Sequence, residues 1–288
     1  MIVLLFGQGG QVGLELKKSC PSSISLISKS SIDVNFTSLD DISDCIYQSK
    51  PDFIINAAAF TDVEKAEADP DQVFQVNSLA PETIAMHAKN LNIPLLHIST
   101  DFVFDGSGNK PWLPKDKANP ANIYGKSKAD GERRIIQSGC KYCVLRTSWI
   151  FSEHNKNFLK TVINISKTNK SISVVNDQIG GPTSARSIAG ACYKIIDSYS
   201  KNKFVSGIFH FTGYPDVSWA AFAKAIFSLM RSDTRVKEIS SAEFKSVARR
   251  PKNAQLNCDS LYSTYNIKRS SWKLDLVEVI NALNKNEN

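Results

Sequence analysis

The sequence lacks the features that would place the chain in a membrane or on a nucleic acid. No apolar run approaches the roughly 20 residues that a membrane-spanning helix needs. The apolar N-terminus, MIVLLFGQGG, has no basic segment and soon reaches glycines, unlike a signal peptide. The net charge is +7, but no block of five like charges occurs. We therefore expect a cytoplasmic protein that binds neither a membrane nor a nucleic acid.

Cysteine usage argues against a structural metal site. The chain has six cysteines, of which Cys140 and Cys143 form a CxxC. A zinc site would need a second such pair, and the sequence has none. A redox-active pair would lie at the start of a helix, whereas Cys143 falls in the apolar run YCVLRTS. We expect six free thiols.

The sequence does have a globular composition and alternating strand and helix patterns. Of its 288 residues, 42% are apolar and 22% are charged. Short apolar runs, typical of parallel strands buried on both faces, occupy residues 2–6, 23–28, 52–59, 94–100 and 142–148. Helical spacing of apolar residues follows at 11–19, 38–50, 71–90 and around residue 124. This alternation predicts an α/β fold with a Rossmann-type, doubly wound parallel sheet over residues 1–150.

The pattern is looser after residue 150. Helical spacing occurs near residues 157–168, 184–199, 218–230 and 274–283, and short strand patterns occur at 172–175 and 207–211. We expect residues 151–288 to form mainly a smaller, C-terminal substrate-binding lobe, with some segments returning to the Rossmann sheet.

A glycine-rich turn follows the first predicted strand. Gly7, Gly10 and Gly13 in GQGGQVG precede a helix, and glycines there allow a pyrophosphate to approach the helix N-terminus. The spacing is GxxGxxG rather than the common GxGxxG, and such turns also serve packing alone. The position favours a dinucleotide, so we expect residues 1–150 to bind NADPH or NADH.

The end of the second predicted strand bears on the choice between these cofactors. Lys29 could meet a ribose 2′-phosphate, which would favour NADPH, although a single loop lysine is more often plain surface. Asp33 could cap a helix or contact the adenine. Neither residue decides between NADPH and NADH.

One helical segment carries a tyrosine and a lysine on the same face. In NIYGKSK, Tyr124 precedes Lys128 by one helical turn. A nearby ammonium should lower the phenol pKa, and such a phenol can donate a proton to a carbonyl oxygen. A lone YxxxK is usually a solvated face, but the preceding strand ends at Thr100, whose hydroxyl could bond the same oxygen. We predict that Thr100, Tyr124 and Lys128 are catalytic.

This constellation resembles the extended, nucleotide-sugar type of short-chain dehydrogenases and reductases. The motifs INAAAFTDVEKAE, STDFVFDG, YGKSKADGE, LRTSWIF, NDQIGGPT and RRP are similar to those of dTDP-4-dehydrorhamnose reductases, in the same order, from Gly7 to Pro251. That family reduces the C4 ketone of dTDP-4-dehydro-L-rhamnose with NADPH or NADH. The resemblance therefore implies a nucleotide-sugar substrate, with a dTDP-linked 4-keto-6-deoxyhexose expected here.

The resemblance also implies roles for particular residues. Tyr124 matches the proton donor, Lys128 the ribose-binding lysine, and Thr100, Asp101 and Trp149 the substrate contacts. A core tryptophan would explain Trp149 equally well. Residues matching the family's cofactor contacts are Gly10, Gln11, Val12, Asp33, Val34, Ala59, Phe60 and Thr61.

Two consecutive arginines are further candidates for substrate binding. Arg249 and Arg250 could clamp the substrate pyrophosphate through bidentate hydrogen bonds. The alternative is a pair of exposed arginines before a proline turn.

Assembly through a metal ion is the point at which the sequence departs from the family. Some members dimerise through Mg²⁺ held by glutamates, and Glu15 matches one such position. Arg186 stands where an acid would be expected, and a cation cannot bind a metal ion. We expect no metal site, with Mg²⁺ binding left as an alternative, and either a monomer or a homodimer.

Two other functions fit parts of the pattern. Sugar-nucleotide 4,6-dehydratases place an Asp-Glu pair after the threonine, whereas here Asp101 is followed by Phe102. An epimerase, or a reductase of another keto-deoxysugar, would share the fold. The regulatory subunit of methionine adenosyltransferase resembles the family without being a catalyst, and the Thr-Tyr-Lys set favours catalysis over that function.

Overall fold

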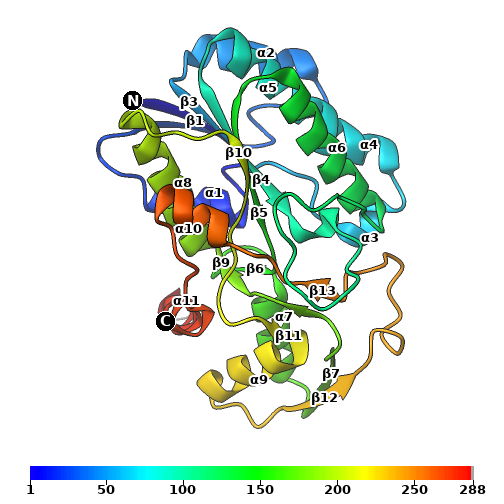
Figure 1. Cartoon of the computed structure of the whole chain (residues 1–288). Coiled ribbons are helices and arrows are strands. Elements are labelled where there is room, and N and C mark those ends of the chain that lie inside the picture. The colour runs from blue at the N-terminus through cyan, green and yellow to red at the C-terminus, as the bar shows by residue number, and fades with distance from the viewer. Residues whose placement is uncertain (287–288) are drawn as a thin grey trace.

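The chain forms a six-stranded parallel sheet, with five strands from the alternating first half and one from residues 207–210. The computed structural model describes residues 1–286 (Figure 1). The strands are hydrogen-bonded in the order β10-β5-β4-β3-β1-β2. Their bounds are β1 (Ile2–Phe6), β2 (Ser25–Lys29), β3 (Phe53–Asn56), β4 (Pro94–Thr100), β5 (Lys141–Thr147) and β10 (Gly207–His210). The chain changes direction across the sheet between β1 and β3, where ligands bind in folds of this type.

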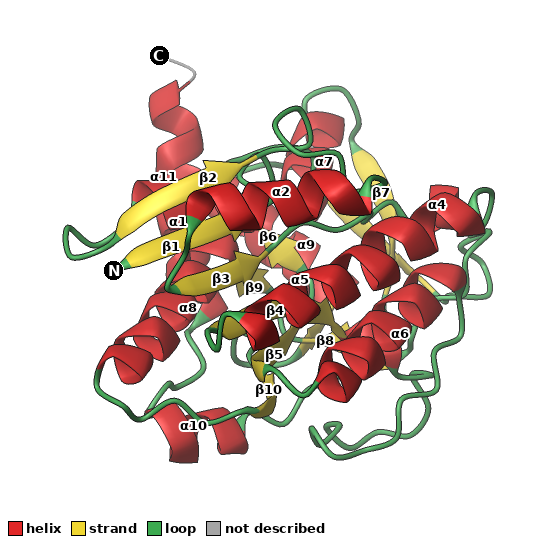
Figure 2. Ribbon diagram, turned by 90° about the horizontal axis from the view of Figure 1, so that it is seen from above, coloured by secondary structure: helices red, strands yellow, loops and turns green. Residues whose placement is uncertain are grey.

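Helices cover both faces of the sheet because alternate strand residues point to opposite sides. Val3 and Leu5 pack with one set of helices, and Leu4 and Phe6 with the other. The first set is α1 (Gln11–Lys18), α8 (Ala185–Ser200) and α10 (Asp259–Tyr265). The second set is α2 (Leu39–Ser49), α5 (Ala80–Asn90) and α6 (Ile123–Ser138), which lie in a row across the sheet (Figure 2). The predicted Rossmann-type α/β fold is confirmed.

A smaller lobe lies below the sheet in Figure 1 and has its own apolar core. Phe151, Phe222 and Trp272 are among the buried residues of that core. Its helices are α7 (Phe158–Ser166), α9 (Trp219–Met230) and α11 (Trp272–Asn286). Its strand pairs and sheet are β7 (Ser171–Val175) with β12 (Arg235–Ile239), β6 (Ile150–Phe151) with β9 (Thr183–Ser184), and β8 (Ile179–Gly180) between β11 (Val217–Ser218) and β13 (Asn253–Ala254).

Most sequence-predicted elements are confirmed, with two strands at identical bounds. The helix predicted over residues 71–90 is instead divided into α4 (Pro70–Phe74), the π-helical turn η1 (Gln75–Leu79) and α5. The short helix α3 (Val63–Ala66), the 3₁₀ turn η2 (Asp101–Val103), α10 and β12 were not predicted. All six cysteines are free, as expected.

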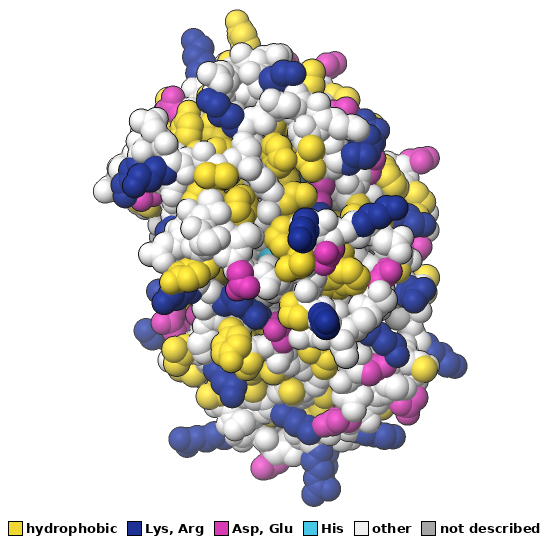
Figure 3. Space-filling view, viewed as in Figure 1, with side chains coloured by type: hydrophobic (Ala, Val, Ile, Leu, Met, Phe, Trp, Pro, Cys, Tyr) yellow, Lys and Arg dark blue, Asp and Glu magenta, His cyan; other side chains and the backbone are white. Residues whose placement is uncertain are grey.

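The surface carries charges of both signs. On the face seen in Figure 3, basic and acidic side chains are interspersed over both lobes. Among residues 1–286, no helix is long and apolar enough to cross a membrane.

Candidate functional site

The glycine-rich turn after β1 is shaped partly by packing and partly by open space. Gly7 has φ +89°, and a Cβ there would lie 2.5 Å from the backbone nitrogen of Ala58. A Cβ on Gly13 would lie 2.1 Å from the carbonyl oxygen of Gly7. By contrast, a Cβ on Gly9 would meet nothing within 4 Å. Gly7 and Gly13 are therefore required by the fold, whereas the backbone at Gly9 is open to a ligand.

A cavity of about 480 Å³ opens beside this turn. It is lined from the β1 end by Gly7, Gly9 and Gly10, and from the β3 end by residues 57–60, so it lies at the switch point of the sheet. Of the expected cofactor contacts, Ala59 and Phe60 line it, whereas Thr61 is exposed beyond its edge. Gln11 and Val12 lie in the first turn of α1. That first turn contains no acidic residue. That first turn therefore leaves the positive end of the helix dipole available to an anion.

The end of β2 is organised differently from the sequence expectation. Ser30 and Ser31 line the cavity, while Lys29 does not. One carboxylate oxygen of Asp33 accepts hydrogen bonds from the Ser30 N–H and hydroxyl, both 2.7 Å, and from Gln8 Nε2 at 2.9 Å. The bonds from Ser30 lower the pKa of Asp33. Asp33 therefore closes a turn, and the Val34 side chain packs into the sheet core.

A buried asparagine joins the cofactor-side loop to the helix that carries the tyrosine. Asn77, in the π-helical turn, accepts from the Phe60 N–H at 2.8 Å and donates to the Phe60 carbonyl at 3.0 Å. Its Nδ2 also donates to Ser127 Oγ at 3.0 Å. A Cβ on Gly131 would lie 2.2 Å from the Asn77 carbonyl oxygen, so the helix approaches this turn closely. The widened turn thus places Asn77 between the two parts of the site.

The predicted catalytic residues come together where β4 ends and α6 begins. Asn122 caps α6 by accepting from the Gly125 N–H at 2.7 Å, and Tyr124 follows in the first turn. Thr100 ends β4, and its hydroxyl lies near enough to the phenol of Tyr124 to influence the pKa of that phenol. Thr100 Oγ1 also donates to Asp101 Oδ1 at 3.2 Å. Thr100 and Asp101 thus lie at the carboxyl end of β4, and Tyr124 lies in the first turn of α6.

The phenol of Tyr124 is less acidic than the sequence suggested. The Phe102 ring packs edge-to-face on it, with ring centroids 5.4 Å apart. Burial raises the Tyr124 pKa to about 12, a rise that the Thr100 hydroxyl partly opposes and Asp101 reinforces. The expected lowering of the Tyr124 pKa by Lys128 was wrong, because the lysine ammonium points to β4 instead. The consequence is a tyrosine that stays protonated at neutral pH.

Lys128 is buried and held by two acceptors of β4. Its Nζ lies 3.0 Å from His97 Nε2 and donates to the Ile98 carbonyl at 2.8 Å. An ammonium has three donors, so one remains for a ligand. Burial lowers the Lys128 pKa to about 8, against the opposing effect of Glu132. Burial also lowers the pKa of His97 well below its usual value, so the ring is neutral and accepts the bond.

A buried ion pair supports this arrangement from below. Arg146 of β5 binds both carboxylate oxygens of Glu132, which lies one turn after Lys128, with N–O distances of 2.6–3.1 Å. Both side chains are 3% exposed. Ser99 donates to the same carboxylate at 2.5 Å. The pair fixes α6 against β4 and β5 and so fixes the position of Lys128.

Asp101 is a buried carboxyl group with an unused oxygen. Its residue is 2% exposed, and Oδ2 has no hydrogen-bond partner among the described residues. Burial raises the Asp101 pKa to about 7, and the Thr100 hydroxyl opposes this rise. The group is thus close to half-protonated at neutral pH.

Trp149 lies after β5 in a strained conformation. Its φ is +51°, a region that costs a non-glycine residue about 1–2 kcal/mol. The indole stacks on Trp219 of the smaller lobe at a centroid distance of 3.7 Å, and Gly180 also packs against it. One face of the Trp149 indole is therefore covered by Trp219, so a ligand would contact the part of the ring that Trp219 leaves uncovered.

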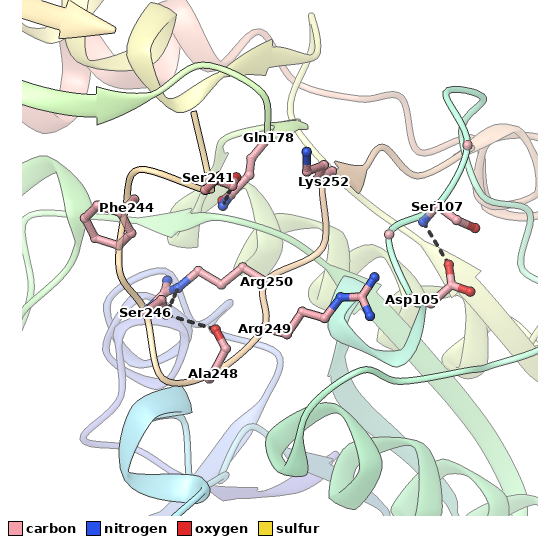
Figure 4. A pocket seen from close by; sticks show the side chains of 13 residues that line it. Asp105, Ser107, Gln178, Ser241, Phe244, Ser246, Ala248, Arg249, Arg250 and Lys252 are labelled. Carbon is pink, nitrogen blue, oxygen red and sulfur yellow. Dashed lines mark hydrogen bonds between the residues drawn. The ribbon is translucent and has the colours of Figure 1, made fainter. Parts of the chain in front are cut away.

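The two arginines lie at a second cavity, of about 490 Å³, between the lobes. Its lining residues include Asp105, Gln178, Phe244, Arg249, Arg250 and Lys252. Figure 4 shows the side chains of Arg249 and Arg250 pointing in opposite directions. Arg250 Nη2 is paired with Glu64 Oε1 at 2.9 Å, whereas Arg249 extends towards Asp105. The two guanidinium groups therefore do not form one clamp in this structure.

The position expected to hold a metal ion in some relatives is a mixed-charge cluster. Glu15, Glu153 and His154 offer ligand atoms within 4.8 Å of one another. His154 Nε2 lies 2.7 Å from Glu15, and the Lys18 ammonium lies 2.8 Å from Glu153. Arg186 pairs with Glu278 on the nearby surface. The Lys18 ammonium already neutralises part of the carboxylate charge that would attract a metal ion.

Comparison with known proteins assigns the chain to a family. The family model described as "RmlD substrate binding domain" matches residues 1–285. The chain belongs to this family. A dTDP-4-dehydrorhamnose reductase of Sinorhizobium fredii is 35% identical over 98% of both chains.

Solved structures of the RmlD-type family agree with this assignment. The structure of a dTDP-4-dehydrorhamnose reductase from Clostridium acetobutylicum superposes with a TM-score of 0.93 at 35% identity, covering 99% of this chain and 100% of the other. The enzyme of that name from Bacillus anthracis, in complex with NADP, superposes with a TM-score of 0.92 at 29% identity, covering 98% and 99%.

Several residues of this RmlD-type site were missed from the sequence. Asn77, His97, Glu132 and Arg146 all contact the predicted residues or their neighbours. For His97 in PLLHIST and Arg146 in YCVLRTS, the signal is a polar or charged side chain inside an apolar run. Such a residue must find a buried partner.

Proposed function

We propose that the protein reduces the C4 ketone of dTDP-4-dehydro-L-rhamnose to give dTDP-L-rhamnose, using NADPH or NADH, in nucleotide-sugar biosynthesis. The observation that carries the proposal is the contact between Thr100 and a protonated Tyr124, one turn from a buried Lys128, at the carboxyl end of β4. The names of the full-length relatives supply the substrate class.

The residues around the first cavity fit a dinucleotide. A side chain at Gly9 would project into open space, and one at Gly10 would meet only a single atom, at 3.4 Å. A backbone without side chains there, at the start of α1, suits a pyrophosphate. We propose that Gly7, Gly10, Gln11, Val12, Gly13, Ala59 and Phe60 form this part of the cofactor site. Bound reduced nicotinamide would supply the hydride for C4 of the sugar.

The protein side chains would handle the oxygen of the ketone. Tyr124 is protonated at neutral pH, which is the form that a reduction needs, and an alkoxide is a stronger base than a phenolate. We propose that Tyr124 donates its proton to the oxygen while the Thr100 hydroxyl holds that oxygen in place. The remaining donor of Lys128 would hold a ribose hydroxyl. In this account, the high phenol pKa supports proton donation.

The substrate diphosphate would lie in the second cavity. Arg249 and Lys252 line it and provide positive charge for the anionic diphosphate. We also propose that residues 1–150 form the cofactor domain and 151–288 mainly the substrate lobe, with β10, α8 and α10 joining the sheet. The cytoplasm, where reduced cofactor is available and thiols stay free, is the proposed location.

A dehydratase is the second candidate, and one contact argues against it. Removal of water would need a further acid after Asp101, but Phe102 stands there and packs on Tyr124. A catalyst of simple reduction needs no such acid.

The test is to follow reduced nicotinamide absorbance with purified protein, dTDP-4-dehydro-L-rhamnose, and NADPH or NADH. We expect signal loss that requires the sugar nucleotide and is slowed by roughly 100-fold or more in Tyr124→Phe. Signal loss with neither cofactor, from folded protein that binds NADPH, would refute the proposal and favour a binding subunit, which a partner pull-down would then identify.

A further inference from the structure

A five-residue span of the smaller lobe is held to the Rossmann domain by one carboxylate. Glu64 lies in α3, just after the cofactor-side loop that follows β3. The segment that it binds, Ser246–Arg250, is called the 246–250 segment below. The two are separated by more than 180 residues in the sequence. The contact therefore ties the 246–250 segment, most of which lines the second cavity, to the Rossmann domain.

Four donors of the 246–250 segment converge on Glu64. The Ser246 hydroxyl and Arg250 Nη2 bind Oε1 at 2.6 and 2.9 Å. The backbone N–H groups of Val247 and Ala248 bind Oε2 at 3.0 and 3.2 Å. Both carboxylate oxygens are thus fully used by one short segment. Although partial burial opposes it, the bonds from Ser246 and Arg250 lower the Glu64 pKa to about 2, so the group stays ionised.

A second contact ties the same segment to the catalytic helix. Asn122, the cap of α6, donates through Nδ2 to the Arg249 carbonyl oxygen at 2.7 Å. The backbone of Arg249 is therefore held between Glu64 and the first turn of the helix that carries Tyr124. Its guanidinium has no hydrogen bond or ion pair among the described residues and extends into the cavity (Figure 4). Arg250, with its group bound to Glu64, points the other way.

We infer that Glu64 is a positioning residue for substrate binding and that the two arginines have different tasks. Glu64 and Arg250 hold the 246–250 segment in place. Arg249 is left to bind the anionic part of the nucleotide substrate. This inference rests on the proposed function for its substrate, but the positioning of the segment is independent of it.

The experiment compares Glu64→Gln with wild type in two assays. In the first, KM for dTDP-4-dehydro-L-rhamnose should rise about tenfold or more, the worth of one charge-assisted hydrogen bond, while kcat and the Kd for NADPH change less than about twofold. In the second, trypsin cleavage after Lys245 should accelerate about tenfold in the free protein. The bond between Arg250 and Pro251 is not a trypsin site, so cleavage there does not interfere.

Glu238→Gln is the matched control. Glu238 also forms a surface ion pair, with Lys224, and its side chain is 43% exposed against 38% for Glu64. Its partners lie within the smaller lobe, so both assays should give wild-type values. Ser246→Ala, which removes one of the four donors, should give smaller shifts in the same direction and serves if Glu64→Gln does not fold.

The arginine variants separate the two tasks. Arg249→Gln should raise KM without changing cleavage after Lys245, whereas Arg250→Gln should change both. Wild-type KM and wild-type cleavage in Glu64→Gln would overturn the inference, as would equal cleavage in the two arginine variants. If wild type does not turn over the sugar nucleotide, the proposed function fails, while the trypsin assay still tests the positioning role.

Discussion

Replacing Asp101 by asparagine should raise the stability of the protein relative to wild type by an amount that grows as the pH rises. The wild-type carboxyl has a pKa of about 7 when folded, against 3.8 when free. Between these values the folded state binds a proton that the unfolded state has released, so the stability of wild type falls as the pH rises through this range. About 3 pKa units at 1.36 kcal/mol each give a loss of about 4 kcal/mol, complete above pH 7.

Asparagine removes this loss because it carries no charge. Its amide nitrogen would take the place of Oδ2, which already lacks a partner, and any cost of that group is the same at all pH values. The pH-dependent part of the difference is therefore the prediction. Urea unfolding of both proteins, followed by the fluorescence of the four tryptophans, should show the variant gaining about 4 kcal/mol on wild type between pH 4 and pH 8.

Asp105→Asn is the control without a trend in this pH range. Hydrogen bonds from Ser107 lower the Asp105 pKa below 3.8, so the stability that this carboxylate contributes is already nearly complete at pH 4. The stability difference between this variant and wild type should therefore be nearly the same at pH 4 and pH 8. A stability difference between Asp101→Asn and wild type that is the same at pH 4 and pH 8 would refute the assignment of a raised pKa to Asp101.

Four other substitutions follow from the same structure. Tyr124→Phe should lower kcat by roughly 10²–10⁴-fold with NADPH affinity unchanged, and steady-state kinetics that show near-normal turnover would contradict its role. Gly13→Ala should destabilise by at least about 1–3 kcal/mol in urea unfolding, since its Cβ would lie 2.1 Å from a backbone oxygen, whereas Gly9→Ala should leave stability unchanged and weaken only NADPH binding. Glu132→Gln leaves Arg146 buried without its partner charge and should cost about 3–5 kcal/mol in the same assay; a cost below 1 kcal/mol would mean that the pair is solvated.

The fold class and the positions of most sheet strands could be predicted because they depend on local patterns. β1 and β4 are continuous apolar runs, which is what burial on both faces requires, and their predicted bounds agree with the structure. The same reasoning brought Thr100, Tyr124 and Lys128 to one edge of the sheet, since parallel strands end together.

The predictions that failed concern properties that depend on contacts between distant segments. Helical periodicity does not reveal that Asn77 binds Phe60, a contact that accompanies the π-helical turn within the predicted helix. The direction of the Tyr124 pKa shift depends on burial of the phenol beside Phe102 and on the Lys128 ammonium pointing to His97.

The arginines show the same limit. Their sequence, RRP, suggests one clamp, but Arg250 is taken by Glu64, 186 residues away in the chain. Nothing in the local pattern separates it from Arg249. Sequence reasoning therefore selected this segment but could not assign different tasks to the two side chains.

The most direct test of the proposed reaction is to follow the hydride itself. NADPH carrying deuterium at C4 of the nicotinamide would be incubated with the protein and dTDP-4-dehydro-L-rhamnose, and the product examined by mass spectrometry and NMR. The account predicts one deuterium at C4 of the sugar in the wild-type product, and none above background with Tyr124→Phe over the same time. Deuterium at another carbon, or consumption of the sugar nucleotide without deuterium transfer, would contradict it.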